Sequence, residues 1–174
     1  NFTYNSYPIL SNYALSSSSV ARTSTSVISI QVSDGQDSAS ELTVSTQYRA
    51  SSGDWKTTYL STLWYDSSDS RWETNFTPTA SAVLGDYDLR IMVNDTGGLS
   101  SGWSTYSDVF TVTNNNPSLS NYALSSSSVL RTNTIVIGIN STDIEDSEST
   151  HTIVTQYRAT SGGWKTSYLS TVWY

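Results

Sequence analysis

Short runs in which apolar and polar residues alternate recur along this chain, with turn-forming residues between them. In the run 41–50, every second residue belongs to one set, namely Leu42, Val44, Thr46 and Tyr48. Because successive side chains of a strand point to opposite faces, a period of two predicts that this set faces a core. Ile28 and Ile30 are predicted to face inward for the same reason.

Seven such runs are predicted as strands between Pro8 and Asn116. They cover residues 10–15, 25–33, 41–50, 55–60, 71–77, 87–94 and 108–113. Short strands at regular spacing, separated by turn signals, are typical of an antiparallel sandwich or barrel. The predicted fold class is therefore all-β, with about seven strands in each repeat.

One stretch of the chain is written twice. The string SNYALSSSSV occupies 11–20 and again 120–129, an offset of 109 residues, and this offset holds without a gap from 8–65 against 117–174. Of these 58 aligned positions, 39 are identical, including two tryptophans and the string TQYRA. Identity at this level indicates a tandem duplication.

The boundary between repeats is predicted at three asparagines followed by Pro117, because these residues favour turns and proline cannot donate to a strand ladder. Residues 1–7 are interpreted as the last strand of a preceding repeat and 8–116 as a complete sandwich. Residues 117–174 are interpreted as the first part of the next repeat, cut before its later strands. On this interpretation the chain is an excerpt of a longer array.

Two turns can be compared between the copies. Gly53 is matched by Gly162, which predicts a tight hairpin with positive φ at this position. In contrast, Gly35 becomes Ile144, which a primed hairpin turn would strain, so the link between 25–33 and 41–50 is predicted to be a wider loop.

The composition supports an all-β protein and excludes some functions. Ser and Thr number 36 and 24 of the 174 residues, and helix-forming residues are scarce. The net charge of −7, with only eight Lys and Arg, argues against a nucleic-acid partner. No apolar run has the length of a membrane span, and without cysteine no disulfide holds the fold.

Four Asn-x-Ser/Thr sequons mark candidate glycosylation sites. They begin at Asn1, Asn75, Asn94 and Asn140. Pro78 and Asp95 make two of them poorer acceptors. Because sequons act only in exported chains, a used site would indicate an extracellular protein.

The string LGDYDLRIMV resembles the start of strand F in immunoglobulin-like and fibronectin type III-like sandwiches. Gly85, Tyr87 and Leu89 match the Gly-x-Tyr-x-Cys/Leu pattern of these domains. The resemblance implies that Tyr87 anchors its hydroxyl on nearby backbone, and that Leu89 takes the place of a core cysteine. The segment that follows looks like the closing strands of repeats in archaeal and bacterial surface proteins, so such a source is expected.

No catalytic arrangement is found in the complete repeat. Residues 1–116 contain neither histidine nor cysteine, which excludes Ser-His-Asp and Cys-His devices there. Asp86 and Asp88 flank Tyr87 and are expected to be solvated. The protein is therefore predicted not to be an enzyme and to need no cofactor.

Calcium is the one ion for which the sequence offers ligands, because carboxylates gather in two matching loops. The weak candidates are Asp34, Asp37, Asp143 and Asp146. Their spacing matches no known calcium-loop motif, so solvated loops are the favoured interpretation.

Aromatic residues exceed what one small core needs. The candidates for contact between units, or for stacking on sugar rings, are Trp55, Tyr59, Trp64, Trp103 and Trp164. Packing within the fold is the favoured interpretation.

The first functional hypothesis is a structural extracellular protein, a segment of a surface layer, stalk or filament whose partners are other copies of itself. The alternative is an adhesin or carbohydrate-binding module that uses exposed tryptophan and tyrosine. Both hypotheses place the protein at the cell surface.

Overall fold

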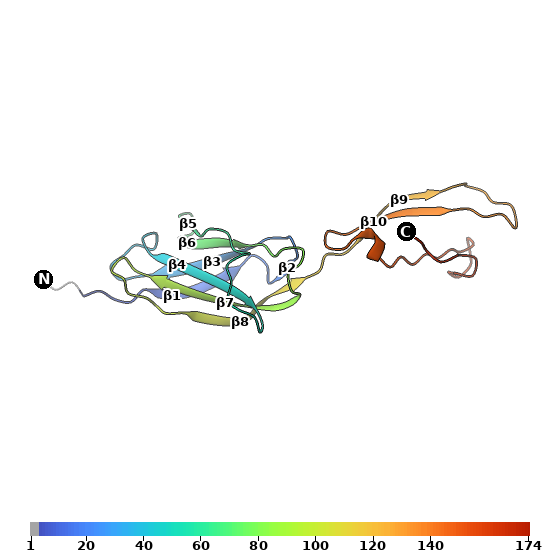
Figure 1. Ribbon diagram of the computed structural model, residues 1–174. Helices are drawn as coiled ribbons and strands as arrows, with labels where there is room; N and C mark the ends of the chain where they lie inside the picture. The colour runs from blue at the N-terminus through green and yellow to red at the C-terminus, as the bar shows by residue number, and fades with distance from the viewer. Residues whose placement is uncertain (1–3) are drawn as a thin grey trace. The chain divides into compact units, whose positions relative to one another are not determined.

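The computed structural model describes residues 4–174 and is built from β-strands and loops, with one short 3₁₀ helix (Figure 1). The chain divides into two compact units, Asn1–Asn114 and Asn115–Tyr174. The predicted repeat boundary lies two residues after this division. Within the described part of the chain, no helix is long and apolar enough to cross a membrane.

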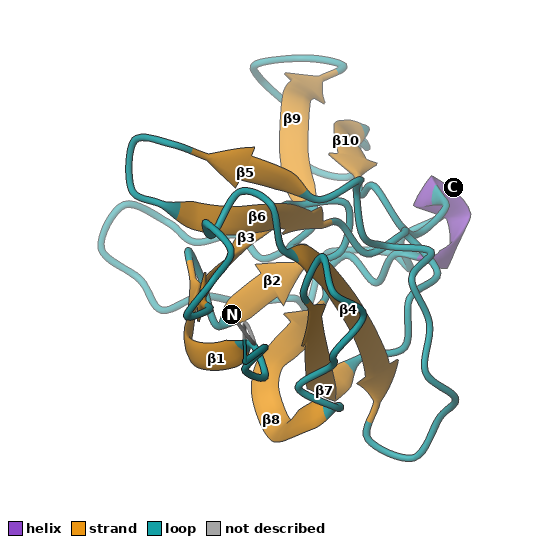
Figure 2. Cartoon of the chain, turned by 90° about the vertical axis from the view of Figure 1, so that its left-hand side faces the viewer, coloured by secondary structure: helices purple, strands orange, loops and turns teal. Residues whose placement is uncertain are grey.

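The first unit consists of two four-stranded sheets, which Figure 2 shows as two layers. One sheet has the order β1-β3-β6-β5, formed by Ile9–Leu15, Ser26–Ser33, Arg71–Phe76 and Trp64–Asp66. The other has the order β2-β8-β7-β4, formed by Ser19–Ala21, Ser104–Thr113, Gly85–Asn94 and Thr43–Ala50.

The strand order confirms the predicted all-β, immunoglobulin-like sandwich. If β1, β3, β6 and β5 are taken as strands A, B, E and D, and β4, β7 and β8 as C, F and G, the sheets are ABED and CFG. Neighbouring strands are antiparallel, except that short β2 runs parallel to β8. The loop from β3 to β4 crosses between the sheets, as its sequence predicts.

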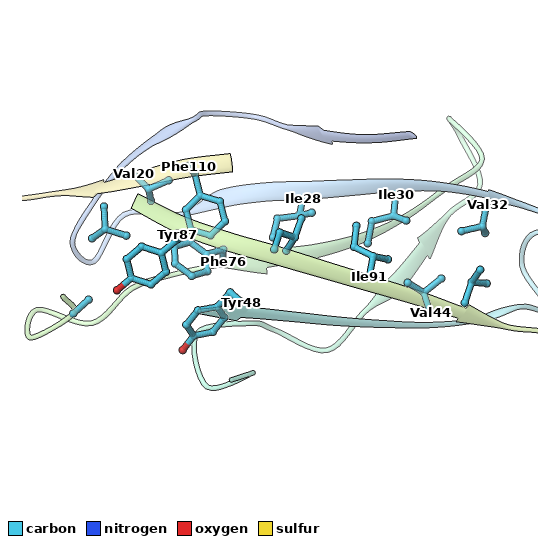
Figure 3. Packing of buried hydrophobic residues seen from close by; sticks show 14 of the residues in the cluster. Val20, Ile28, Ile30, Val32, Val44, Tyr48, Phe76, Tyr87, Ile91 and Phe110 are labelled. Atoms are coloured by element: carbon cyan, nitrogen blue, oxygen red, sulfur yellow. The ribbon is translucent and has the colours of Figure 1, made fainter. Parts of the chain in front are cut away.

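The core lies between the two sheets and is graded along its length (Figure 3). Aromatic rings gather at one end, and aliphatic side chains such as Ile30 and Val44 fill the other. Phe76 is fully buried, with its ring centroid 4.4 Å from that of Phe110 and 5.2 Å from that of Tyr48. These contacts join β4, β6 and β8 across the interior.

The period of two assigns the faces of the long strands correctly. The four predicted inward side chains of the run 41–50 are buried, with Leu42 directly before β4 and the other three on it. On β3, Ile28 and Ile30 have no exposed surface. Thr74 lies between Trp72 and Phe76 on β6 and is also buried, with its hydroxyl donating to the Ser61 carbonyl over 2.9 Å. That hydrogen bond explains why a polar residue is tolerated in the core.

The strand predicted at 55–60 is wrong. Lys56 forms a single bridge to Tyr48 on one sheet, and Leu60 forms another to Phe76 on the other sheet. The segment between them turns, with the Leu60 N–H donating to the Thr57 carbonyl over 2.8 Å. The segment therefore passes from one sheet to the other instead of continuing as a strand.

Two short strands escape the sequence pattern. Strand β2 follows the serine-rich bend and pairs with β8, while β5 pairs Trp64 with Glu73 on β6. Each has three residues, which is too few to show an alternation. Val20 nevertheless anchors β2, because its side chain is 2% exposed and belongs to the core.

The prediction of positive φ at Gly53 and Gly162 is wrong as well. Both turns form, with the glycine N–H donating to the carbonyl of Ala50 over 2.8 Å and of Ala159 over 2.9 Å. Among the described glycines, however, positive φ is found at Gly85, Gly98 and Gly102. An i to i+3 turn of this kind is satisfied by ordinary backbone angles.

The second unit forms a two-stranded sheet in the described residues. Strand β9 (Ser118–Leu124) pairs antiparallel with β10 (Ile137–Thr142), and a 3₁₀ helix follows at Glu148–Thr150. Pro117 precedes β9 as Pro8 precedes β1. A second complete sandwich is not formed, so the tandem arrangement of sandwiches stays a prediction.

The interpretation of residues 1–7 as the last strand of a preceding repeat stays a prediction. Residues 1–3 lie outside the described part, and 4–8 form no strand. The Ser6 N–H donates to Gln36 Oε1 over 2.9 Å, and Asn5 Nδ2 donates to Asp95 Oδ2 over 2.9 Å. This segment is held by loops of the first unit, as a linker that docks on the sandwich would be.

Candidate functional site

The outer face of the sheet formed by β4 and β7 carries a row of arginine and tryptophan side chains. Arg49 and Arg90 lie on the face opposite the core, because Tyr48 and Leu89, which directly precede them in sequence, point inward. The register pairs Gln47 with Arg90, which brings side chains of both strands together. Trp55 follows the turn after β4, and Trp103 precedes β8.

These four side chains form what we call the tryptophan–arginine stack, defined by Arg49, Trp55, Arg90 and Trp103. The Arg49 guanidinium carbon lies 4.5 Å from the Trp55 ring centroid, and that of Arg90 lies 4.6 Å from it. Arg90 also lies 4.3 Å from the Trp103 ring centroid. Such cation–π contacts contribute about 0.5–2 kcal/mol each, depending on how far they are desolvated.

Hydrogen bonds fix the two guanidinium groups. Arg90 Nε donates to Gln47 Oε1 over 2.7 Å, and Arg49 Nε donates to Asp88 Oδ2 over 2.8 Å. Asp88 also accepts the backbone N–H of Asp108 over 3.1 Å. The stack is thus tied to three strands, and its geometry is set by the sheet.

Asp88 differs from the expectation that it is solvated. It is 4% exposed and paired with Arg49, whereas Asp86 is exposed as expected. Burial raises the pKa of Asp88, but the hydrogen bonds from Arg49 and Asp108 outweigh burial and hold that pKa below its ordinary value. Asp88 is therefore a charged structural partner of Arg49.

The second copy repeats part of the stack without the rest of the sheet. The Arg158 guanidinium carbon lies 4.6 Å from the Trp164 ring centroid. Tyr157 and Lys165 exchange backbone hydrogen bonds of 3.0 and 2.8 Å, the same lengths that Tyr48 and Lys56 show in the first unit. The turn that carries this tryptophan is therefore specified by its local sequence.

The aromatic candidates fall into two groups. Tyr59 stacks on Tyr48 with ring centroids 5.0 Å apart and packs against the core, so it offers no open ring face. The Trp55 ring is occupied by two guanidinium groups. Trp64, Trp103 and Trp164 are 37%, 39% and 59% exposed, and for them contact with a partner or a sugar stays a prediction.

The tyrosine at the start of β7 makes the contact that the family resemblance implies. The Tyr87 hydroxyl donates to the Val83 carbonyl over 2.9 Å, and its ring is 2% exposed. Gly85 precedes it with φ of +112°, a conformation that favours glycine. Leu89 has no exposed surface. These residues fix the corner where the chain enters β7.

The first pair of calcium candidates accepts hydrogen bonds from the chain, although Asp34 Oδ2 is buried without a hydrogen-bond partner among the described residues. Asp34 Oδ1 accepts the N–H groups of Gln36 and Asp37 over 2.8 and 3.1 Å. Asp37 accepts the N–H and hydroxyl of Thr96 over 2.9 and 2.8 Å. Both carboxylates therefore shape their loop.

The second pair lies in the matching loop of the second unit. Asp143 Oδ1 accepts the N–H groups of Glu145 and Asp146 over 2.8 and 3.1 Å. The hydrogen bond from the Glu145 N–H lowers the pKa of Asp143. Asp146 is exposed. For both loops calcium binding stays a prediction.

A third acidic group lies at the β5–β6 hairpin. Carboxylate oxygens of Asp66, Asp69 and Glu73 lie within 4.8 Å of one another. Asp66 accepts the Ser68 N–H over 2.8 Å, and Glu73 accepts the Ser29 hydroxyl over 2.8 Å. Asp69 Oδ2 lies 3.8 Å from Arg71 Nε, so each of the three carboxylates has a polar neighbour in the protein.

The sequons lie in different environments. Asn1 falls outside the described residues. Asn75 and Asn94 are half-buried on β6 and β7, and Asn140 is exposed on β10. Asn140 is thus the most accessible of the three described candidates, and their use stays a prediction.

The single histidine, His151, lies within hydrogen-bond distance of a serine side chain. Ser141 Oγ lies 2.6 Å from His151 Nδ1. By the offset of 109 these residues match Val32 and Leu42, which are both buried in the core of the first unit. Two buried apolar residues of the first unit thus correspond to two polar neighbours in the second.

Sequence reasoning identified the tryptophans of the stack but not their partners. The alternation of the run 41–50 puts Arg49 opposite the inward set, but this position carries no sign of a partner. The contacts with Asp88 and Arg90 depend on the register between β4 and β7, which are separated by about forty residues along the chain. A search for opposite charges on outward positions of both strands is the signal that would have found them.

Comparisons with known proteins give limited similarity. No protein family matches the chain, and neither does any curated protein. Among solved structures, the chain is similar to the crystal structure of the titin domains z1z2 in complex with telethonin, with 15% sequence identity and a TM-score of 0.39. The match covers 82% of this chain and 66% of that chain, slightly less than two thirds of its length. The fold class of this protein accordingly rests on its own strand order.

Proposed function

We propose that this chain is a structural part of an extracellular protein built from tandem immunoglobulin-like units, acting as a surface layer, stalk or filament. The observation that carries the proposal is the duplication, with 39 identical residues among 58 at a constant offset of 109. The identity includes core residues and linker-flanking prolines alike. A repeat of this kind preserves a whole building unit, whereas an active site needs only a few residues.

The pairing of a strand near the start of the first unit with the strand at its end supports a load-bearing role. Strand β2, near the start of the unit, runs parallel to β8 at its end. The Thr111 N–H donates to the Ser18 carbonyl over 2.8 Å, and the Arg22 N–H donates to the Thr113 carbonyl over 2.9 Å. When parallel strands near opposite ends of a unit are pulled apart, their hydrogen bonds are loaded together instead of one after another.

The same linker contact occurs at both copies. The Ser6 N–H donates to Gln36 Oε1 over 2.9 Å, and the Asn115 N–H donates to Glu145 Oε1 over 3.3 Å. Ser6 matches Asn115 and Gln36 matches Glu145 at the offset of 109. Each unit thus holds the segment that precedes it, which restricts the freedom of the linker.

The surface chemistry fits an exposed environment. The Ser- and Thr-rich faces carry few charges, and Asn140 offers an accessible glycosylation site. An archaeal or bacterial cell surface is the proposed location. The partners in this proposal are further copies of the same unit.

The test uses the native protein on intact cells. Protease treatment of whole cells is expected to release fragments of this chain, and mass spectrometry is expected to find glycan on Asn140. Electron microscopy of the purified material is expected to show filaments, stalks or a lattice. A chain that is protected from external protease, or that purifies as isolated monomers, would contradict the proposal.

A further inference from the structure

A hollow of about 480 Å³ lies beside the free edge of β4 in the first unit, and we call it the edge hollow. Residues 44–47 of β4 form one wall, and the segment 60–63, which bridges to the other sheet, forms another. The lining is completed by Thr57, Thr74 and Trp103. Its volume lies within the range of small-molecule sites, about 300–1,000 Å³.

One polar side chain of the edge hollow is buried without a partner. Thr46 is 5% exposed, and its hydroxyl makes no hydrogen bond within the described residues. Buried polar groups are nearly always paired, so an orphan hydroxyl in the lining of a hollow indicates a ligand that pairs with it. The second copy keeps threonine here, as Thr155, although the inward position before it changes from Val44 to Ile153.

The backbone of β4 adds further groups that lack partners. Tyr48 exchanges two backbone hydrogen bonds with Lys56 across this edge, over 3.0 and 2.8 Å. Because the N–H and C=O groups of alternate residues in a strand point to the same side, those of Val44 and Thr46 face this edge too. Within the described residues, the one strand that pairs with β4 is β7, on the opposite edge. The edge hollow therefore offers backbone donors and acceptors as well as the Thr46 hydroxyl.

The rest of the lining is polar but uncharged, and it carries one large aromatic ring. Further hydroxyl groups are supplied by Ser45, Thr57, Ser61 and Thr62. Gln47 Oε1 accepts Arg90 Nε over 2.7 Å, which makes Nε2 the donor that Gln47 can offer. Trp103 is 39% exposed although Arg90 lies 4.3 Å from its ring centroid, so part of its ring surface is open to a ligand.

We propose that the edge hollow binds a pyranose unit of a neutral oligosaccharide. Sugar hydroxyls both donate and accept, so one ring can pair with the Thr46 hydroxyl and with the edge N–H and C=O groups. The apolar face of a pyranose ring packs on an aromatic side chain such as Trp103. An acidic sugar would find no counter-charge, because no charged residue lines the hollow. The inference does not depend on the structural role proposed above.

An extended peptide is the other ligand that a free strand edge can take. Lys56 already occupies the edge at Tyr48, and β4 begins at Thr43. The open edge is thus shorter than a strand of ordinary length, about five or six residues. Strand addition also pairs backbone with backbone in the plane of the sheet, and it does not reach the inward hydroxyl of Thr46. These observations favour a sugar.

The test titrates the whole chain with neutral trisaccharides of glucose, mannose, galactose and N-acetylglucosamine, to millimolar concentration. At least one is expected to shift the amide NMR signals of Thr46 and Thr57 and to change tryptophan emission. Trp103→Ala is expected to weaken binding by about tenfold or more, because the stacking surface is lost. Trp64→Ala is the matched control and is expected to leave the affinity unchanged, since Trp64 is 37% exposed but lies on β5, outside the hollow.

Thr46→Val separates binding from folding. Loss of the hydroxyl is expected to weaken sugar binding about three- to tenfold. The free energy of unfolding without sugar is expected to stay equal or to rise, because a buried polar group without a partner is removed. A threonine with a purely structural role would give the opposite pattern, with lower stability and unchanged affinity.

Two further arms identify the source of the ligand. Retention of the chain on cellulose, mannan or chitin beads, competed by the matching trisaccharide, would support a polymer, whereas binding of the free trisaccharide alone would support a soluble sugar. The peptide TVSTQYRA, which has the sequence of β4, probes strand addition. The proposal would be overturned if no sugar binds, if affinity is unchanged in both Thr46→Val and Trp103→Ala, or if the peptide alone shifts the Val44 and Thr46 amides.

Discussion

The two copies allow one substitution to be made in the same local sequence with and without a covered core. Ile28 and Ile137 both follow a valine in matching strands, β3 and β10. Ile28 is 0% exposed and Ile137 is 39% exposed. Ile28→Ala and Ile137→Ala therefore compare burial with the mutated side chain and the preceding valine held constant.

The magnitudes follow from this burial. Removing three carbon groups from a fully buried isoleucine forfeits about 2.4 kcal/mol of transfer free energy, at about 0.8 kcal/mol per group. The cavity left in a closed core raises the cost of Ile28→Ala to about 3–4 kcal/mol. Ile137 loses at most about 1.5 kcal/mol, because part of its surface is already hydrated and solvent fills the space.

Urea unfolding gives the free energy of unfolding, and hydrogen exchange assigns each loss to its unit. Ile28→Ala is expected to lower the midpoint at an unchanged m-value, with faster exchange confined to the first unit. Ile137→Ala is expected to leave the first unit unaffected. The reasoning would be refuted by equal losses for the two variants, or by a loss below about 1 kcal/mol for Ile28→Ala.

Three further substitutions test single contacts. Tyr87→Phe removes the hydrogen bond to Val83 and is expected to lower the free energy of unfolding, measured with urea, by about 1 kcal/mol. An unchanged free energy of unfolding would show that this hydrogen bond does not stabilise the fold. Arg90→Lys removes the planar guanidinium beside Trp103. It is expected to lower the free energy of unfolding by about 1 kcal/mol and to change tryptophan emission. Emission identical to that of the native chain would contradict the contact. The lowered pKa of Asp88 contributes stability that is present above about pH 4 and lost as the pH falls through the folded-state pKa. The loss in free energy of unfolding caused by Asp88→Asn is therefore expected to become smaller in acid. A loss that does not depend on pH would contradict this.

The long strands were predictable because each carries its own pattern. In β4, Val44 and Tyr48 alternate with polar residues over eight positions, and burial on one face is the only arrangement that satisfies all of them. The tyrosine at 87 was also recognisable from its neighbours. These features depend on residues that are close in sequence.

The remainder depends on contacts between distant residues. The segment 55–60 is rich in the aromatic and β-branched residues that favour strands, but its ends bridge to Tyr48 on one sheet and Phe76 on the other, and the backbone must turn between them. Asp88 looks solvated until the register brings Arg49 beside it. The tryptophan–arginine stack could not be predicted for the same reason, because it needs the pairing of β4 with β7.

The central claim is that the protein is a structural array of units of 109 residues, and stretching single native molecules tests it most directly. Each unit is expected to unfold in one step and to release about 360–390 Å of chain, before the folded length is subtracted, at 3.3–3.6 Å per residue. A regular series of equal steps is the predicted result. Steps of irregular length, or extension without resistance, would contradict the account.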